Sequence, residues 1–119
     1  MQKAVLLLIV WTFSLFGEDP QYNRGEMLYF TKGCNGCHGP SAEGGGNVPR
    51  LAQQGQNILI NRLDFFRSGN VSSQTQEMMV QFTLKLSDKE IEDLSYFFHN
   101  HHIDTKEEVS SELLGGFGS

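Results

Sequence analysis

Cysteine is scarce in this sequence. Its 119 residues include only two cysteines, Cys34 and Cys37, which stand three positions apart. A pair so close together is a poor disulfide framework for a small secreted protein. The pair is also too small to complete a structural zinc site, which takes four ligands. No internal repeat is visible, and repeat architectures are therefore not indicated.

Basic residues are also few. Lysine and arginine number 9 against 14 aspartates and glutamates, and the formal net charge at pH 7 is −5. Nucleic-acid binding usually requires a positively charged surface, so no nucleic-acid partner is indicated. Mild acidity instead suits solubility, or docking to a basic patch on another protein.

The longest apolar run is too short for a transmembrane helix. It covers positions 4–16, follows Lys3, and is interrupted only by Thr12 and Ser14. A membrane-spanning helix needs about 20 apolar residues. This pattern predicts a secretory signal peptide over residues 1–17. The cleavage site lacks a clean A-x-A pattern, and an uncleaved anchor, which would tie the protein to a membrane, stays open as the alternative.

The two cysteines belong to a short motif with specific chemistry. Cys34, Cys37 and His38 form the pattern C-x-x-C-H, which is the attachment signature of a c-type haem. The two thiols add to the vinyl groups of haem, and the adjacent imidazole reaches the iron from one face. A redox disulfide or part of a zinc site is the competing interpretation. The sequence predicts one covalent haem c, and export to the site of attachment agrees with it.

Three segments carry helical patterns, over residues 21–33, 56–67 and 87–100. Their apolar residues recur at the three- and four-residue spacing of an amphipathic helix. The third segment opens on a capping box formed by Ser87 and Glu90. Residues 70–86 are mostly polar up to the methionine pair at 78–79 and carry spaced apolar residues after it, and this segment is the expected place of the sixth iron ligand.

Residues 39–55 are predicted to form a loop, because their glycine density rules out regular structure. Glycine also allows the backbone to lie close against a flat ligand. A ligating histidine usually donates its free ring N–H to an acceptor, for which the Pro49 carbonyl is the candidate. Arg50 is a candidate partner of a haem propionate, with a solvated surface charge as the alternative.

Met78 and Met79 are the candidates for the sixth iron ligand. A thioether is a neutral ligand, and ligation by histidine and methionine raises the iron potential into the range of electron carriers. The alternative role for either methionine is that of flexible core filler.

Three histidines, His99, His101 and His102, crowd the end of the last predicted helix. They are candidate metal or alternative haem ligands, although a charged histidine is also favourable against a helix C-terminus. The chain after the predicted signal peptide divides into a domain over residues 18–103 and a mobile tail over residues 104–119.

From residue 21 to about 98 the sequence resembles the small class I cytochromes c of the bacterial c553/c4 type. The resemblance starts from the haem motif and its following glycine. It continues in four further segments: G-N-V-P-R-L-A at 46–52, F-R-S-G at 66–69, the methionine pair, and L-S-D-K-E-I-E-D-L at 86–94. The haem motif alone is specific for haem, and the other segments in this order indicate the subfamily.

The resemblance implies a role for each motif residue. Cys34 and Cys37 would be the thioether residues and His38 the proximal ligand. In such proteins the distal methionine lies seven residues before the leucine that precedes the capping serine. Here that leucine is Leu86, which makes Met79 the match and Met78 the runner-up.

The resemblance also implies an all-α fold, with three to four helices wrapped around one covalent haem. The first and last helices would cross near Gly25, with Leu94 and Phe97 on the other side. From sequence alone, Gly25 is either such a close approach or a weak point in its helix. Ile58 and Phe97 stand where related sequences often carry tyrosine.

The function implied is that of a periplasmic single-electron carrier without a catalytic step. Its partners would be redox proteins, an electron donor and an acceptor such as a terminal oxidase, peroxidase or reductase. The alternative is a haem subunit permanently docked to a larger oxidoreductase. A third hypothesis, a haem sensor or peroxidase-like protein, is less favoured because no distal acid–base group stands near Met79 in the sequence.

Overall fold

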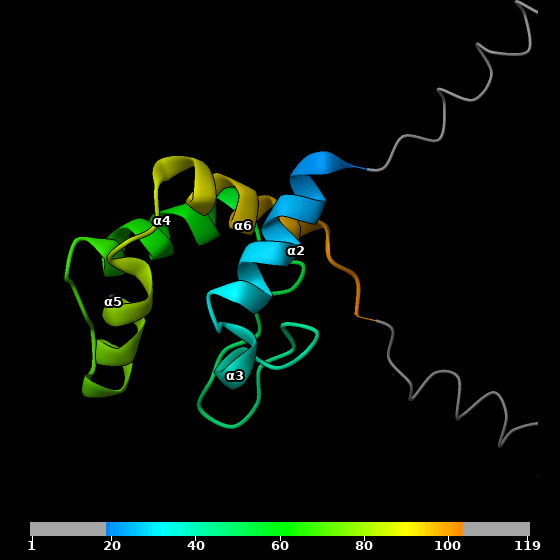
Figure 1. The fold of residues 1–119 in the computed structure, drawn as a ribbon. Coiled ribbons are helices and arrows are strands. Elements are labelled where there is room, and N and C mark those ends of the chain that lie inside the picture. The colour runs from blue at the N-terminus through cyan, green and yellow to red at the C-terminus, as the bar shows by residue number, and fades with distance from the viewer. Residues whose placement is uncertain (1–18, 104–119) are drawn as a thin grey trace, which may run out of the picture.

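The structure, a computed structural model, describes residues 19–103. The predicted leader (1–17) and tail (104–119) lie outside the described residues. The described chain is helical, and Figure 1 labels its elements: α2 (Pro20–Thr31), α3 (Asn35–His38), α4 (Gln56–Arg67), the 3₁₀ helix η2 (Gln74–Gln76), α5 (Glu77–Thr83) and α6 (Asp88–Asn100). Within it, the one strand-like pairing is an isolated bridge between Gly45 and Val48. The predicted all-α fold is confirmed.

Helices α2 and α6 form the central packing unit. They cross at Gly25, where an added Cβ would meet the Asp93 carbonyl oxygen and lie 2.5 Å from Phe97 Cβ. The predicted crossing is therefore present, and the absence of a side chain at Gly25 permits it. Beside the crossing, the Arg24 guanidinium donates from Nε to Asp93 Oδ2 at 3.0 Å, although Asp93 is buried.

The start of α6 follows the predicted capping box. The Ser87 hydroxyl accepts from the Glu90 N–H at 3.1 Å, and the Glu90 carboxylate accepts from the Ser87 N–H at 3.1 Å. These reciprocal bonds satisfy backbone donors that a helix N-terminus leaves open. The apolar face of α6 is buried; it comprises Ile91, Leu94, Phe97 and Phe98.

Arg67 at the end of α4 joins that helix to the start of α6. Its guanidinium donates to the Leu86 carbonyl oxygen at 3.0 Å, to Asp64 Oδ1 at 2.7 Å and to Asp88 Oδ1 at 2.7 Å. One planar side chain thus joins α4 to the start of α6 and to the turn that directly precedes α6. This contact gives a physical reason for the F-R-S-G segment singled out in the sequence.

The helix α5 and the turn η2 before it were not predicted. Residues 70–77 are mostly polar, and α5 spans only Glu77–Thr83. Isolated helices this short are unstable in water, and such helices depend on tertiary packing. The packing is provided by α4, against which α5 lies.

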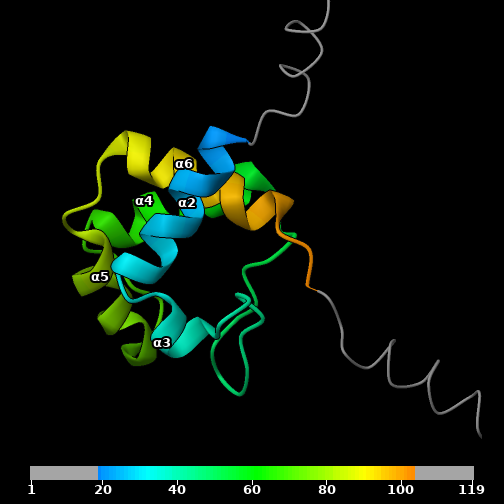
Figure 2. The same cartoon turned by 45° about the vertical axis from the view of Figure 1, so that its right-hand side comes forward.

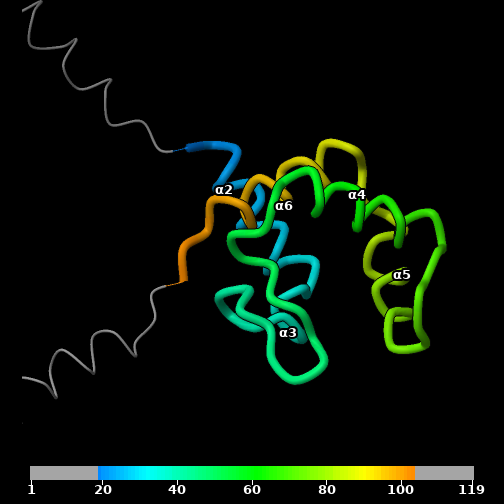
Figure 3. The backbone as a smooth tube through the Cα atoms, turned by 180° about the vertical axis from the view of Figure 1, so that it is seen from behind, coloured from blue at the N-terminus to red at the C-terminus, as the bar shows by residue number. Residues whose placement is uncertain are grey.

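The helices are arranged around one centre. In Figure 2, α2, α4 and α6 lie in the upper part of the domain, α5 lies at the left and α3 lies below. The chain between α3 and α4 runs along the remaining side, as the backbone tube seen from behind in Figure 3 also shows. The two ends of the described chain lie on one side of the molecule, away from α5.

Candidate haem site

A cavity of about 550 Å³ lies between the helices. That volume falls within the range of about 300–1,000 Å³ typical of small-molecule sites. Its apolar wall comes from α4, α5, α6 and the turn between α5 and α6, with residues that include Leu59, Phe66, Phe82, Leu86, Leu94 and Phe98. Cys34, Cys37 and His38 line the same cavity.

The short helix α3 presents the cysteine pair to the cavity. It is closed by the His38 N–H, which donates to the Cys34 carbonyl oxygen at 3.0 Å. Both cysteines are free thiols, Cys34 half-buried and Cys37 exposed. Burial raises the pKa of the Cys34 thiol, which favours its protonated form. One turn of helix therefore holds two thiol sulfur atoms on the wall of the cavity.

His38 is held in a single useful tautomer. Its side chain is buried, and its Nδ1 lies 2.9 Å from the Pro49 carbonyl oxygen, the acceptor suggested by the sequence. A carbonyl oxygen can only accept, and Nδ1 must therefore carry the hydrogen. In the neutral ring, Nε2 then keeps the lone pair that a metal requires.

The glycines of the loop place Pro49 opposite His38. Gly44 has a φ of +68°, and its N–H donates to the His38 carbonyl oxygen at 2.8 Å. A Cβ on Gly44 would lie 2.6 Å from Pro49 carbon and Arg50 nitrogen. Gly44, Gly45 and Gly46 do not line the cavity, whereas Asn47, Val48 and Pro49 of the same loop do. The close approach of Gly44 is to the loop's own backbone.

Tyr29 secures the same turn from α2. Its hydroxyl donates to the Gly39 carbonyl oxygen, directly after His38. Its ring packs edge-on against Phe98, with centroids 5.5 Å apart. Burial raises the pKa of the Tyr29 hydroxyl to about 12, which keeps it a donor throughout the neutral range. Sequence analysis did not identify this contact, because Tyr29 looks like an ordinary residue of an apolar helix face.

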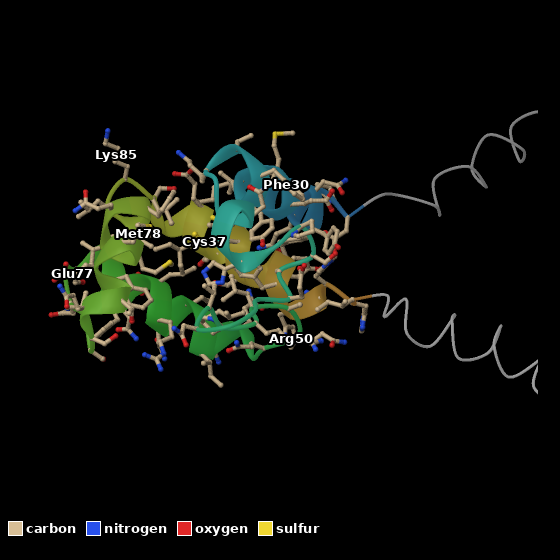
Figure 4. All side chains as sticks on the ribbon, turned by 90° about the horizontal axis from the view of Figure 1, so that it is seen from below. Phe30, Cys37, Arg50, Glu77, Met78 and Lys85 are labelled. Atoms are coloured by element: carbon tan, nitrogen blue, oxygen red, sulfur yellow. The ribbon has the colours of Figure 1, made fainter. Side chains whose placement is uncertain are left out.

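Both candidate methionines line the cavity from the first turn of α5. Figure 4 shows Met78 on α5 and Cys37 on α3, two elements that face the same cavity. Met78 is 61% exposed, whereas Met79 is half-buried. Met79 also shares its helix face with the buried Thr83, whose hydroxyl donates to the Met79 carbonyl oxygen at 2.8 Å. These observations distinguish Met79 from Met78.

The predicted propionate partner, Arg50, does not line the cavity. Its Nε donates to the Ala52 carbonyl oxygen at 3.2 Å, and its other nitrogen donates to Gln53 Oε1 at 2.5 Å. Two other cations do line the cavity, Lys32 at the end of α2 and Arg62 in α4.

The three clustered histidines point to three separate partners. His101 Nδ1 accepts from the Tyr22 hydroxyl or donates to it at 2.8 Å. His99 Nδ1 lies 2.8 Å from the Gln54 carbonyl oxygen, and His102 Nδ1 lies 2.8 Å from Gln53 Nε2. None of the three lines the cavity, and residues 19–103 contain no group of three or more potential metal ligands. In this part of the chain the cluster bonds to the loop and to α2.

These residues fit a covalently bound haem. An apolar cavity accepts a large flat ring, two thiols stand on one wall, and the adjacent imidazole keeps its Nε2 lone pair. A methionine pair lines the same cavity from a different helix. An all-helical domain built around such a site defines the class of c-type cytochromes.

The chain belongs to the cytochrome c family. Its residues 22–102 match the family model that is described as Cytochrome c. The match extends over the histidines, which the sequence resemblance left outside. Its cofactor is one covalent haem c, and family members are electron carriers.

Solved structures agree with this assignment. The chain is similar to reduced recombinant cytochrome c4 from Pseudomonas stutzeri, with 30% identity, a TM-score of 0.63, and coverage of 71% of this chain and 50% of that chain. Cytochrome c4 from Acidithiobacillus ferrooxidans shares the fold at 22% identity and a TM-score of 0.59, with 72% and 52% coverage. The chain thus spans about half the length of these proteins. No curated protein gives a significant match.

Among residues 19–103, no helix has both the length and the apolar character that a membrane span requires.

Proposed function

We propose that this protein is an exported single-electron carrier in which His38 and Met79 bind the haem iron from opposite faces. Cys34 and Cys37 would hold the haem through thioether bonds. The bound haem supplies one-electron oxidation and reduction at iron. The observation that carries the proposal is the hydrogen bond of 2.9 Å between His38 Nδ1 and the Pro49 carbonyl oxygen, which leaves Nε2 for the metal.

The contacts of Pro49 and Tyr29 support a role for both residues in positioning His38. Pro49 fixes the tautomer of His38, and Tyr29 holds the backbone directly after it through Gly39. The apolar walls exclude water, which favours ligation by a neutral thioether and strengthens electrostatic effects on the iron. If His38 and Met79 both hold the iron, no ligand position would remain for a substrate, and we propose no catalytic step.

The proposed location is the periplasm, and the proposed partners are a donor and an acceptor protein. Support for export comes from the leader-like residues 1–17 and from the free cysteine pair, which haem attachment consumes. The alternative is a haem subunit held permanently in a larger oxidoreductase. In that case the tail over residues 104–119 and any uncleaved leader would be the attachment features.

The test is to produce the full chain together with a haem-attachment system and to purify it without denaturation. We expect haem that survives denaturing electrophoresis, a six-coordinate low-spin spectrum, and no carbon monoxide binding by the reduced protein at neutral pH. A chain without attached haem, or ready carbon monoxide binding, would overturn the proposal.

Size-exclusion chromatography of the protein from its native source separates the carrier from the subunit. A free species of the mass of one small domain supports the carrier. Co-elution of all the haem-stained protein with a larger, salt-resistant complex supports the subunit instead.

A further inference from the structure

Arg62 interrupts the apolar stripe of α4. Leu59, Leu63 and Phe66 form that stripe, and Arg62 stands three residues after Leu59 and four before Phe66, on the same face. All four residues line the cavity. Arg62 is exposed, and solvent can therefore stabilise its charge where the chain supplies no partner.

No such partner is found for Arg62 among the described residues. The other three arginines in that part of the chain each donate a hydrogen bond to an oxygen atom: Arg24 to Asp93, Arg50 to Ala52 and Arg67 to Asp88. Arg62 makes neither a hydrogen bond nor an ion pair within residues 19–103. Its five N–H donors are therefore available to a group that occupies the cavity.

The cavity itself contains no negative charge to match Arg62. Within residues 19–103, no aspartate or glutamate lines it. The other cation on its wall, Lys32, is already paired, with its Nζ 3.7 Å from Glu90 Oε2. The cavity wall thus presents one uncompensated positive charge, while a haem carries two propionate carboxylates.

We propose that Arg62 is the charge partner of the haem propionates and thereby raises the midpoint potential of the iron. This inference rests on the proposed function, because it requires haem in the cavity. A planar guanidinium matches a carboxylate through two parallel hydrogen bonds. Its positive charge also opposes the extra charge of ferric iron, which favours the reduced state. Arg50, suggested by the sequence, is the competing partner.

The experiment compares potentiometric titrations of haem-loaded wild type with Arg62→Gln, Arg62→Lys, Arg50→Gln and Lys89→Gln. Lys89→Gln is the matched control, since Lys89 is an exposed cation that does not line the cavity. We expect Arg62→Gln to lower the ferrous-to-ferric ratio at a fixed potential by about three- to tenfold. Tenfold corresponds to about 59 mV for a one-electron couple. Arg62→Lys should restore most of the loss, and the control should change little.

An unchanged potential in Arg62→Gln, or an equal fall in Lys89→Gln, overturns the inference. A larger fall in Arg50→Gln than in Arg62→Gln assigns the propionates to Arg50 instead. If Arg62→Gln does not retain haem, Arg62→Lys must retain it, and loss in both variants counts against a charge-based role. Wild type without attached haem would instead refute the proposed function, and staining shows this before any titration.

Discussion

His38 Nδ1 and the Pro49 carbonyl oxygen lie 2.9 Å apart, although the two residues belong to different segments on either side of a glycine-rich loop. The contact gives the loop a role in the proposed site. It fixes the hydrogen on His38 Nδ1 and so leaves Nε2 as the nitrogen that can bind a metal. Gly44 makes the contact possible, since its backbone packs directly against Pro49. The loop contains no helix or strand, but the position of the Pro49 carbonyl group beside His38 is fixed.

Met79 is expected to be the sulfur ligand and Met78 a neighbour that does not bind iron. Met79→Ala should lower the midpoint potential and allow carbon monoxide to bind the reduced haem at neutral pH, because the soft neutral ligand is lost. Met78→Ala should keep both properties, as Met78 is the more exposed of the two. Optical titration with and without carbon monoxide measures the difference. The reverse pattern would assign the ligand to Met78.

Gly25→Ala should destabilise the haem-loaded protein by about 1–3 kcal/mol. Alanine normally favours a helix over glycine by up to about 1 kcal/mol, but here its Cβ would meet the Asp93 backbone and Phe97. Denaturant unfolding followed by circular dichroism provides the measurement. Met27→Ala is the control in the same helix, since Met27 is 67% exposed, and it should change stability by no more than about 0.5 kcal/mol. Equal stability of Gly25→Ala and wild type would contradict the close crossing.

The capping box predicts the effect of Ser87→Ala. This variant removes the oxygen that accepts from the Glu90 N–H, and we expect a loss of about 1 kcal/mol. Ser72→Ala is the matched control, since Ser72 is exposed and precedes no long helix. Both variants are compared with wild type by denaturant unfolding. A loss of the same size in the control would show that the cap has no special role.

The sequence predicted what local patterns determine. The helices at 56–67 and 87–100 and the capping box follow from spacing and caps within one segment. The crossing at Gly25 was expected from the family resemblance, because the residues alone left it open. The helix α5 was missed because its seven residues form a helix only through packing on α4. Local periodicity contains no information on that packing.

The candidate site was likewise predicted only in part. The sequence suggested Pro49 beside His38, and the structure contains that contact. For the propionates the sequence suggested Arg50 and did not single out Arg62, the partner proposed above. Arg62 does have a sequence signal, a cation between Leu59 and Phe66 on one helix face. That signal gains meaning only when the face is known to border a cavity without carboxylates.

Tyr29 predicts a particular response to alkaline pH. Its hydroxyl has an ordinary pKa of 10.0, whereas burial raises the pKa in the folded protein to about 12. Between these values the unfolded chain loses the proton while the folded protein keeps it. The free energy of unfolding must therefore fall as pH rises from about 10 to about 12, by at most about 1.4 kcal/mol per pH unit from this group. Stability from Tyr29 is fully present below pH 10.

Tyr29→Phe removes this titration and leaves the other tyrosines in place. The variant should be less stable than wild type at pH 7, because the Gly39 carbonyl oxygen loses its donor. Above pH 10 its stability should fall less steeply than that of wild type, and the two curves should converge. Denaturant unfolding of both reduced, haem-loaded proteins between pH 7 and 12 tests this. Parallel curves over that range would show that Tyr29 ionises as readily in the folded protein as in the unfolded chain.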